Sequence, residues 1–143
     1  MKKNNLKIII MIAGFAIWWH AQPGFSHMTT NSLTAADAVD YFLVTCEETD
    51  NDHLYLQIGD LGVEDGRQFN VLAIKGRAIV SVTNPDGKTS KAVRVPGNKG
   101  VFHLYVSQTA GGDKAANYQL TYHCEDGDHV HLDTSTTTQM DQP

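Results

Sequence analysis

Hydrophobic and polar residues alternate with a period of two along most of the chain after residue 40. This alternation places successive side chains on opposite faces of an extended segment, so it predicts β-strands. Turn-forming residues such as Asp65-Gly66 and Asn84-Pro85-Asp86-Gly87 separate the alternating runs. Seven strands are expected, with an eighth compatible with the last range, at 41–46, 53–59, 69–75, 78–82, 91–95, 100–107, 117–124 and 129–132. Short strands at this spacing predict an all-β antiparallel sandwich of jelly-roll or immunoglobulin-like type, with a barrel as the alternative.

The first 26 residues do not follow this pattern. Three lysines precede an apolar run of twelve residues at 8–19, and Gly24 and Ser26 supply the small residues that signal peptidase requires. A membrane-spanning helix needs roughly 20 apolar residues, more than this run provides. Residues 1–26 are therefore predicted to be a secretory signal peptide cleaved after Ser26, which leaves no stable membrane span. An uncleaved N-terminal anchor is the alternative.

The rest of the chain is expected to hold one domain. Residues 27–133 are predicted to form the sandwich, and one helical turn at 33–40 is compatible with the sequence before the first strand. The polar segment 134–143 is expected to be a flexible tail.

The composition of the chain and its lack of known motifs narrow the classes of function to consider. The 143 residues include 11 basic and 16 acidic side chains, a net charge of −5, whereas nucleic-acid binders normally carry a basic surplus. No recognised hydrolase, phosphate-binding or metalloprotease motif is present in the sequence. Both observations favour a non-enzymatic protein that does not bind nucleic acid.

The two cysteines, Cys46 and Cys124, lie in the predicted domain. Export would place them in an oxidising compartment, where an even number of cysteines indicates a disulfide. Each falls on the apolar face of its strand, so the sequence predicts a buried Cys46–Cys124 bridge between the first and last strong strands. Two free thiols that ligate a metal are the alternative.

The order of these blocks resembles the bacterial pre-peptidase C-terminal domain family. The blocks that carry this resemblance span 38–124 and are Asp40-Tyr41-Phe42, His53-Leu54-Tyr55-Leu56, Pro96-Gly97 followed by 100–106, and 117–121. The resemblance implies a small β-sandwich that serves as a non-catalytic adhesion or carbohydrate-associated module of secreted proteins. It implies no catalytic residues.

Histidines are the residues most able to carry chemistry. His123, His129 and His131 lie close together, with Glu125, Asp126 and Asp128 among them. Imidazole and carboxylate groups suit Zn²⁺ or Cu²⁺. If the last two long strands form a hairpin in which 107 pairs with 117, His103 lies diagonal to His123 on the outer face. Exposed histidines in a solvated loop are the alternative.

His27 adds a second possibility for copper. Cleavage after Ser26 would make it the mature N-terminus, whose amine and ring nitrogen could chelate copper together with a further histidine. Cleavage one residue later would remove this brace. The candidate metal ligands are therefore His27, His103, His123, His129 and His131.

Two further features of the sequence are weaker indications of a binding site. The acidic segment 47–52 lacks the spacing of an EF-hand loop, so a solvated turn is favoured over a calcium site. Tyr41, Tyr55 and Tyr105 are placed to project outward and could contact a protein or carbohydrate partner. A loop that covers this outer face is the alternative.

The sequence thus predicts an exported, non-enzymatic binding or interaction module, periplasmic or secreted, with an unidentified protein or carbohydrate partner. The alternative is a periplasmic copper- or zinc-binding protein that uses the histidines. A structural subunit of a surface assembly is a third interpretation.

Overall fold

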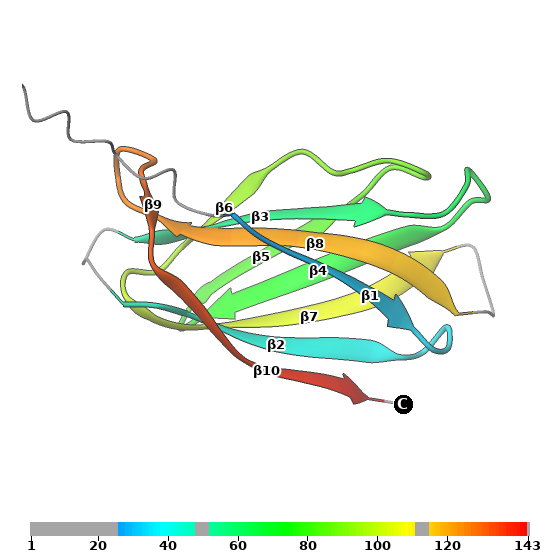
Figure 1. Cartoon of the computed structure of the whole chain (residues 1–143), viewed down its shortest axis with the longest axis horizontal. Coiled ribbons are helices and arrows are strands. Elements are labelled where there is room, and N and C mark those ends of the chain that lie inside the picture. The colour runs from blue at the N-terminus through cyan, green and yellow to red at the C-terminus, as the bar shows by residue number, and fades with distance from the viewer. Residues whose placement is uncertain (1–25, 48–51, 111–114, 143) are drawn as a thin grey trace, which may run out of the picture.

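A computed structural model describes residues 26–47, 52–110 and 115–142. Two antiparallel sheets of five strands each pack face to face as a β-sandwich (Figure 1). The predicted all-β antiparallel sandwich is therefore confirmed. Almost all of the predicted signal peptide, 1–25, and most of the acidic segment, 48–51, lie outside the described residues.

The two sheets have different strand orders. Sheet 1 has the order β1-β8-β3-β6, with β9 pairing with β8, and sheet 2 has the order β10-β2-β7-β4-β5. The strands of sheet 1 are β1 (His27–Leu33), β3 (His53–Asp60), β6 (Val93–Pro96), β8 (Ala116–Glu125) and β9 (His131–Leu132). The strands of sheet 2 are β2 (Val39–Cys46), β4 (Gln68–Lys75), β5 (Ala78–Thr83), β7 (Gly100–Ala110) and β10 (Thr134–Gln142).

The period-two alternation places the core between the sheets. In β2 and β3 every second residue is buried, as the sequence pattern predicts. Burying each large apolar side chain stabilises the fold by roughly 1.5–3 kcal/mol. The largest fully buried side chains include Phe42, Leu54, Phe69, Phe102 and Tyr118.

The disulfide joins the two sheets. Cys46 ends β2 in sheet 2 and Cys124 lies in β8 of sheet 1, with their Cα atoms 5.6 Å apart. Both residues are fully buried. The predicted Cys46–Cys124 bridge is confirmed, and it closes the sandwich across its core.

The expected hairpin between the last two long strands is wrong. β7 pairs with β2 and β4, whereas β8 pairs with β1 and β3 in the other sheet. The chain therefore crosses between sheets after residue 110. Both strands keep their predicted faces, because alternation decides which side chains point inward and says nothing about which strands are neighbours.

Two segments at the ends of the domain differ from expectation. Residues 27–33 form β1 beside β8, and the segment after it contains a turn with an Ala38 N–H to Ala35 C=O hydrogen bond of 3.3 Å rather than a helical turn. The expected flexible tail is wrong for Thr134–Gln142, which pair with β2 as β10. Both are polar edge strands that bind mainly through backbone hydrogen bonds, and threonine favours extended structure.

Among the described residues, none belongs to a helix with the length and apolar character needed to cross a membrane.

Candidate functional site

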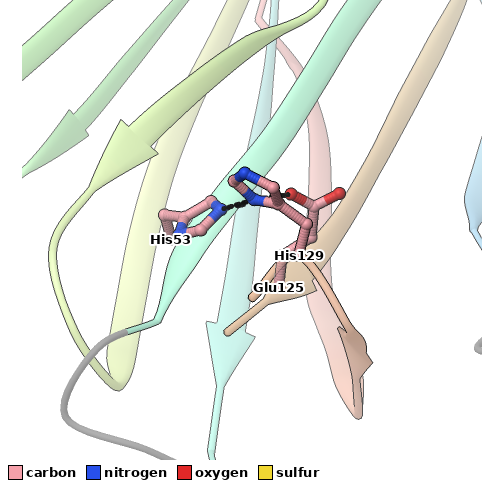
Figure 2. A group of neighbouring side chains, drawn as sticks. All are labelled: His53, Glu125 and His129. Carbon is pink, nitrogen blue, oxygen red and sulfur yellow. Dashed lines mark hydrogen bonds and ion pairs between the residues drawn. The ribbon is translucent and has the colours of Figure 1, made fainter. Parts of the chain in front are cut away.

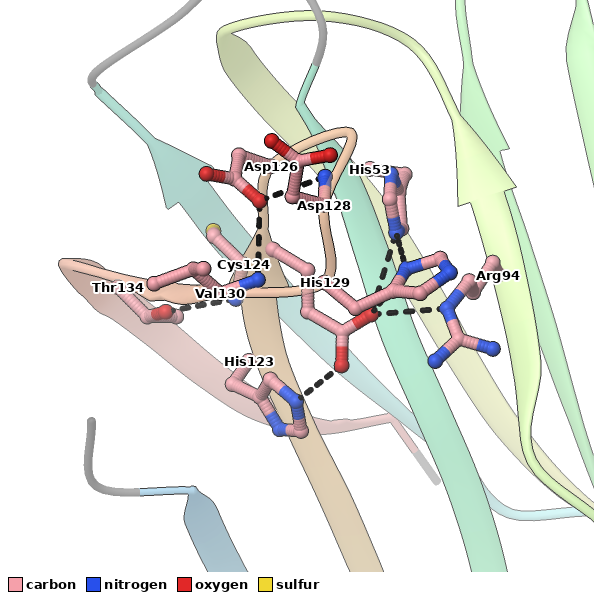
Figure 3. A network of polar contacts seen from close by, with 10 residues as sticks. His53, Arg94, His123, Cys124, Asp126, Asp128, His129, Val130 and Thr134 are labelled. Carbon is pink, nitrogen blue, oxygen red and sulfur yellow. Dashed lines mark hydrogen bonds and ion pairs between the residues drawn. The ribbon is translucent and has the colours of Figure 1, made fainter. Parts of the chain in front are cut away.

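A cluster of polar side chains lies on the outer face of sheet 1, around the start of β3 and the end of β8 (Figures 2 and 3). Its members come from β3, β6, β8, β9 and the β8–β9 turn. We call it the Glu125 cluster, and it consists of His53, Tyr55, Arg94, His123, Glu125, His129 and His131.

The register of the paired strands explains why these side chains lie close together. His53 pairs with Glu125 and Tyr55 with His123, because β3 runs antiparallel beside β8. Glu125 also pairs with His131 on the other side of β8. The intervening residues Leu54 and Cys124 point into the core, so these partners all project from the outer face.

The β8–β9 turn is organised by Asp126. One carboxylate oxygen accepts the backbone N–H groups of Asp128 and Val130, both at 2.9 Å. The turn leaves His129 with a φ of 64°, in the left-handed region that few non-glycine residues adopt. This conformation brings the His129 ring back over the end of β8 (Figure 3).

Glu125 lies at the centre and is only 3% exposed. Its Oε1 atom is hydrogen-bonded to His123 Nε2 at 2.9 Å. Its Oε2 atom accepts the Arg94 Nε–H at 2.8 Å and is hydrogen-bonded to His53 Nε2 at 3.1 Å. His129 Nδ1 lies 3.5 Å from the same oxygen. Both oxygens of one buried carboxylate therefore face nitrogen atoms.

These contacts decide the protonation states of Glu125 and His123. Burial raises the pKa of the Glu125 carboxyl, but hydrogen bonds to His123 and Arg94 and the Arg94 charge outweigh burial, so this pKa lies below its ordinary value. Burial lowers the pKa of His123, and the hydrogen bond to Glu125 opposes this effect without cancelling it. Near neutral pH the cluster therefore combines an ionised carboxylate with a neutral His123 imidazole.

His123 is enclosed between two rings. Tyr55 stacks on it with 4.4 Å between ring centroids, and His131 stacks with 3.8 Å. Its Nδ1 atom is buried and has no hydrogen-bond partner among the described residues. Because Nε2–H donates to the Glu125 carboxylate, Nδ1 of the neutral ring carries a free lone pair.

Two groups of three side chains have the spacing of a metal site, and they share Glu125. One consists of His123, Glu125 and His131, and the other of His53, Glu125 and His129. In each group, one ligand atom per residue lies within 4.8 Å of the others. Figure 2 shows the second group, in which His129 Nδ1 and His53 Nε2 are 3.3 Å apart. Each group could hold a metal ion.

The structure brings three of the five predicted ligands together. His123, His129 and His131 belong to the Glu125 cluster, whereas the expected approach of His103 to His123 is wrong. His103 lies on β7 in sheet 2, where its Nδ1 is hydrogen-bonded to the Tyr41 hydroxyl at 2.6 Å.

His27 also lies apart from the cluster. It pairs with Tyr122 and stacks on that ring with 5.7 Å between centroids. His27 shares the face of Tyr122, and successive residues of a strand point to opposite faces, so His27 lies on the opposite face of sheet 1 from His123. A brace formed by His27 with a histidine of the cluster does not fit this geometry.

Sequence reasoning missed His53 and Arg94 as members of the site. They lie 72 and 31 residues from Glu125 along the chain. The available signal was their outward position in predicted strands, but joining them to Glu125 requires knowing that β3 lies between β6 and β8.

The tyrosines fall into two places. Tyr41 and Tyr105 pack together on sheet 2 with 4.9 Å between ring centroids, alternating with buried residues as the sequence predicts. Tyr55 belongs to the Glu125 cluster on sheet 1. The expected protein or carbohydrate partner stays a prediction.

Comparison of the chain with known protein-family models finds no match, and comparison with curated proteins finds none either. The resemblance to the pre-peptidase C-terminal domain family therefore stays a prediction.

Proposed function

We propose that the protein is an exported, non-enzymatic β-sandwich that binds Zn²⁺ or Cu²⁺ in the Glu125 cluster. The main site is the group of His123, Glu125 and His131. This proposal joins the function that the sequence favoured, a binding module, with the alternative, a metal-binding protein.

The observation that carries the proposal is the buried Nδ1 of His123, which has no hydrogen-bond partner in the part of the chain that the structure describes. A buried polar atom without a partner costs free energy, and a bound metal ion is one way to satisfy such an atom. Metal-binding histidines almost always donate their other N–H to a carboxylate or carbonyl, as Nε2 of His123 does to Glu125. The neutral imidazole is also the form that binds metals.

The donor atoms indicate the metal. Imidazole and carboxylate ligands suit Zn²⁺ and Cu²⁺, whereas Cu⁺ prefers sulfur ligands. Both cysteines are used in the disulfide, so they offer no thiolate. A metal at His123 and His131 therefore meets imidazole nitrogen donors of borderline softness.

Arg94 favours this group over the second one. Its Nε–H donates to Oε2 of Glu125, the oxygen that faces His53 and His129. A cation placed there would compete with the guanidinium and be repelled by its charge. Oε1 instead accepts the His123 Nε2–H, so Glu125 orients that ring and leaves its Nδ1 atom, together with the His131 ring, to bind the metal.

Export is part of the proposal. Its support is the lysine-rich and apolar pattern of 1–26 together with the disulfide, because disulfides persist in oxidising compartments. The proposed location is the periplasm or the extracellular space.

The test is a metal titration of chelator-treated protein by calorimetry, with Zn²⁺ and Cu²⁺ in separate experiments. We expect one ion bound per chain, and His123→Ala and His131→Ala to weaken binding by at least about tenfold. Cu²⁺ should bind more tightly than Zn²⁺. His103→Ala serves as the matched control, since His103 lies on the other sheet.

Circular dichroism checks that each variant is folded. His131 is half-buried in the two-residue strand β9, so its replacement is the milder change. Absence of binding in the wild-type protein, or equal weakening by His103→Ala, would overturn the proposal.

A further inference from the structure

A second polar cluster lies at the opposite end of β3 from His53. It contains Asp60, the last residue of β3, Asp65 in the β3–β4 loop and Asp86 in the β5–β6 loop. One carboxylate oxygen from each lies within 4.8 Å of the others. We call these three residues the aspartate cluster.

Backbone groups hold the three side chains in place. The two oxygens of Asp86 accept the N–H groups of Asp65 and Gly66 at 3.2 and 2.8 Å. Oδ1 of Asp60 accepts the Gly62 N–H at 2.7 Å. These bonds join the two loops and bring the carboxylates together despite their mutual repulsion.

Asp60 supplies independent evidence for a cation site. It is 8% exposed, and its Oδ2 atom is buried with no hydrogen-bond partner among the described residues. Leaving a buried carboxylate oxygen unpaired carries a large desolvation cost. A cation at the cluster would satisfy this oxygen.

The acidic side chains of the two loops are also only partly neutralised by basic side chains. Arg67 forms an ion pair with Asp65 at 2.9 Å, and Lys88 lies 3.9 Å from Glu64. These pairs offset Asp65 and Glu64, whereas among the described residues no basic side chain forms an ion pair with Asp60 or Asp86. A divalent cation would neutralise the remaining pair of carboxylates.

We propose that the aspartate cluster binds a calcium ion, which links the β3–β4 and β5–β6 loops. All of its donors are carboxylate oxygens, the ligands that hard cations prefer. Calcium accepts the flexible oxygen geometry of loop ligands, whereas Mg²⁺ requires near-ideal octahedral geometry and keeps much of its water. The site differs in chemistry and place from the Glu125 cluster and does not depend on the function proposed there.

The test measures calcium binding to the whole protein after treatment with EGTA. Thermal unfolding and calorimetry are followed while calcium rises to about 10 mM, above the range of roughly 0.1–1 mM in which extracellular calcium modules bind. We expect one ion per chain and a melting temperature that rises with the logarithm of calcium concentration. Magnesium at equal concentrations should produce a smaller rise.

Asp60→Asn is the most informative variant. Its side-chain oxygen can still accept the Gly62 N–H, while the amide replaces the unpartnered oxygen. We expect at least about tenfold weaker calcium binding. Without calcium the variant should be at least as stable as the wild type, because a buried charge is removed. A purely structural role of Asp60 would give the opposite change.

Asp65→Asn and Asp37→Asn complete the set. Asp65 is exposed, so its replacement should weaken calcium binding without unfolding the protein. If Asp60→Asn does not fold, Asp65→Asn alone tests whether the aspartate cluster binds calcium. Asp37 is an exposed aspartate before β2 and is the matched control that should bind normally. Failure of the wild type to bind calcium, or an undiminished calcium response in Asp65→Asn, would overturn the proposal. His131→Ala should leave the calcium response unchanged.

Discussion

Nε2 of His123 lies 2.9 Å from Oε1 of Glu125, and both side chains are at least nine-tenths buried. The contact orients the imidazole, and its buried Nδ1 atom has no hydrogen-bond partner among the described residues. One hydrogen bond therefore sets both the tautomer of His123 and the nitrogen that is free for a ligand.

The stability of the metal-free protein should depend on pH through these two residues. The pKa of His123 is lowered from its ordinary value of 6.5, so the unfolded chain takes up a proton before the folded chain does. The free energy of unfolding should then fall as pH decreases below 6.5, by at most about 1.4 kcal/mol per pH unit. The pKa of Glu125 is lowered from 4.5, which adds a second loss below that pH.

Urea unfolding of chelator-treated protein between about pH 8 and pH 5 measures the first of these effects, since the ordinary histidine pKa lies in that interval. His123→Gln should flatten the part of the pH dependence that this histidine contributes. An unchanged slope in the variant would contradict the assignment to His123.

Arg94 should stabilise the fold through Glu125. Its Nε–H donates to a carboxylate that is 3% exposed, while the arginine side chain is 42% exposed. We expect Arg94→Gln to lower the free energy of unfolding by roughly 1–2 kcal/mol, less than for a fully buried pair because solvent screens the guanidinium. Arg94→Lys should recover part of the loss, since lysine keeps the charge without the fork geometry. Equal losses in both variants would show that the charge contributes nothing.

Strand β10 should contribute to stability although its sequence is polar. The Thr134 hydroxyl oxygen accepts the Cys124 N–H at 2.8 Å, and the Tyr122 and Thr136 hydroxyls are 2.6 Å apart. Deleting 134–143 would leave these groups unpaired and expose the edge of β2. We expect a lower melting temperature and concentration-dependent association, measured by thermal unfolding and sedimentation.

A milder variant separates these effects. Thr136→Val removes one hydroxyl and keeps the β-branched shape, so it should cost about 1 kcal/mol without promoting association. If deletion of 134–143 leaves the melting temperature unchanged, β10 does not contribute to the fold in solution.

The disulfide should supply a large part of the stability. Cys46 and Cys124 are 78 residues apart, and closing a loop of that length stabilises by about 4 kcal/mol in the chain-entropy model. The Cys46→Ala, Cys124→Ala double variant should lose a comparable amount in urea unfolding. A loss well under about 1 kcal/mol would show that the bridge adds little to the sandwich.

Alternation of hydrophobic and polar residues by itself determined the fold class, the inward faces and the position of both cysteines. Phe42, Leu54 and Tyr118 could be assigned to the core because side chains of a strand alternate between two faces whatever its neighbours are. The same reasoning placed His123 on an outer face. It also identified the histidine-rich segment 123–131, because these residues are close in sequence.

Tertiary structure decided which outer faces meet. His103 and His123 belong to neighbouring strands in sequence but to different sheets, whereas His53 and Glu125 are 72 residues apart and paired. The edge strands β1 and β10 also depended on tertiary context, because their polar residues carry little hydrophobic pattern. Strand order follows from the packing and hydrogen bonding of the whole sandwich. Alternation within one strand shows which face is buried but does not show which strands pair with it.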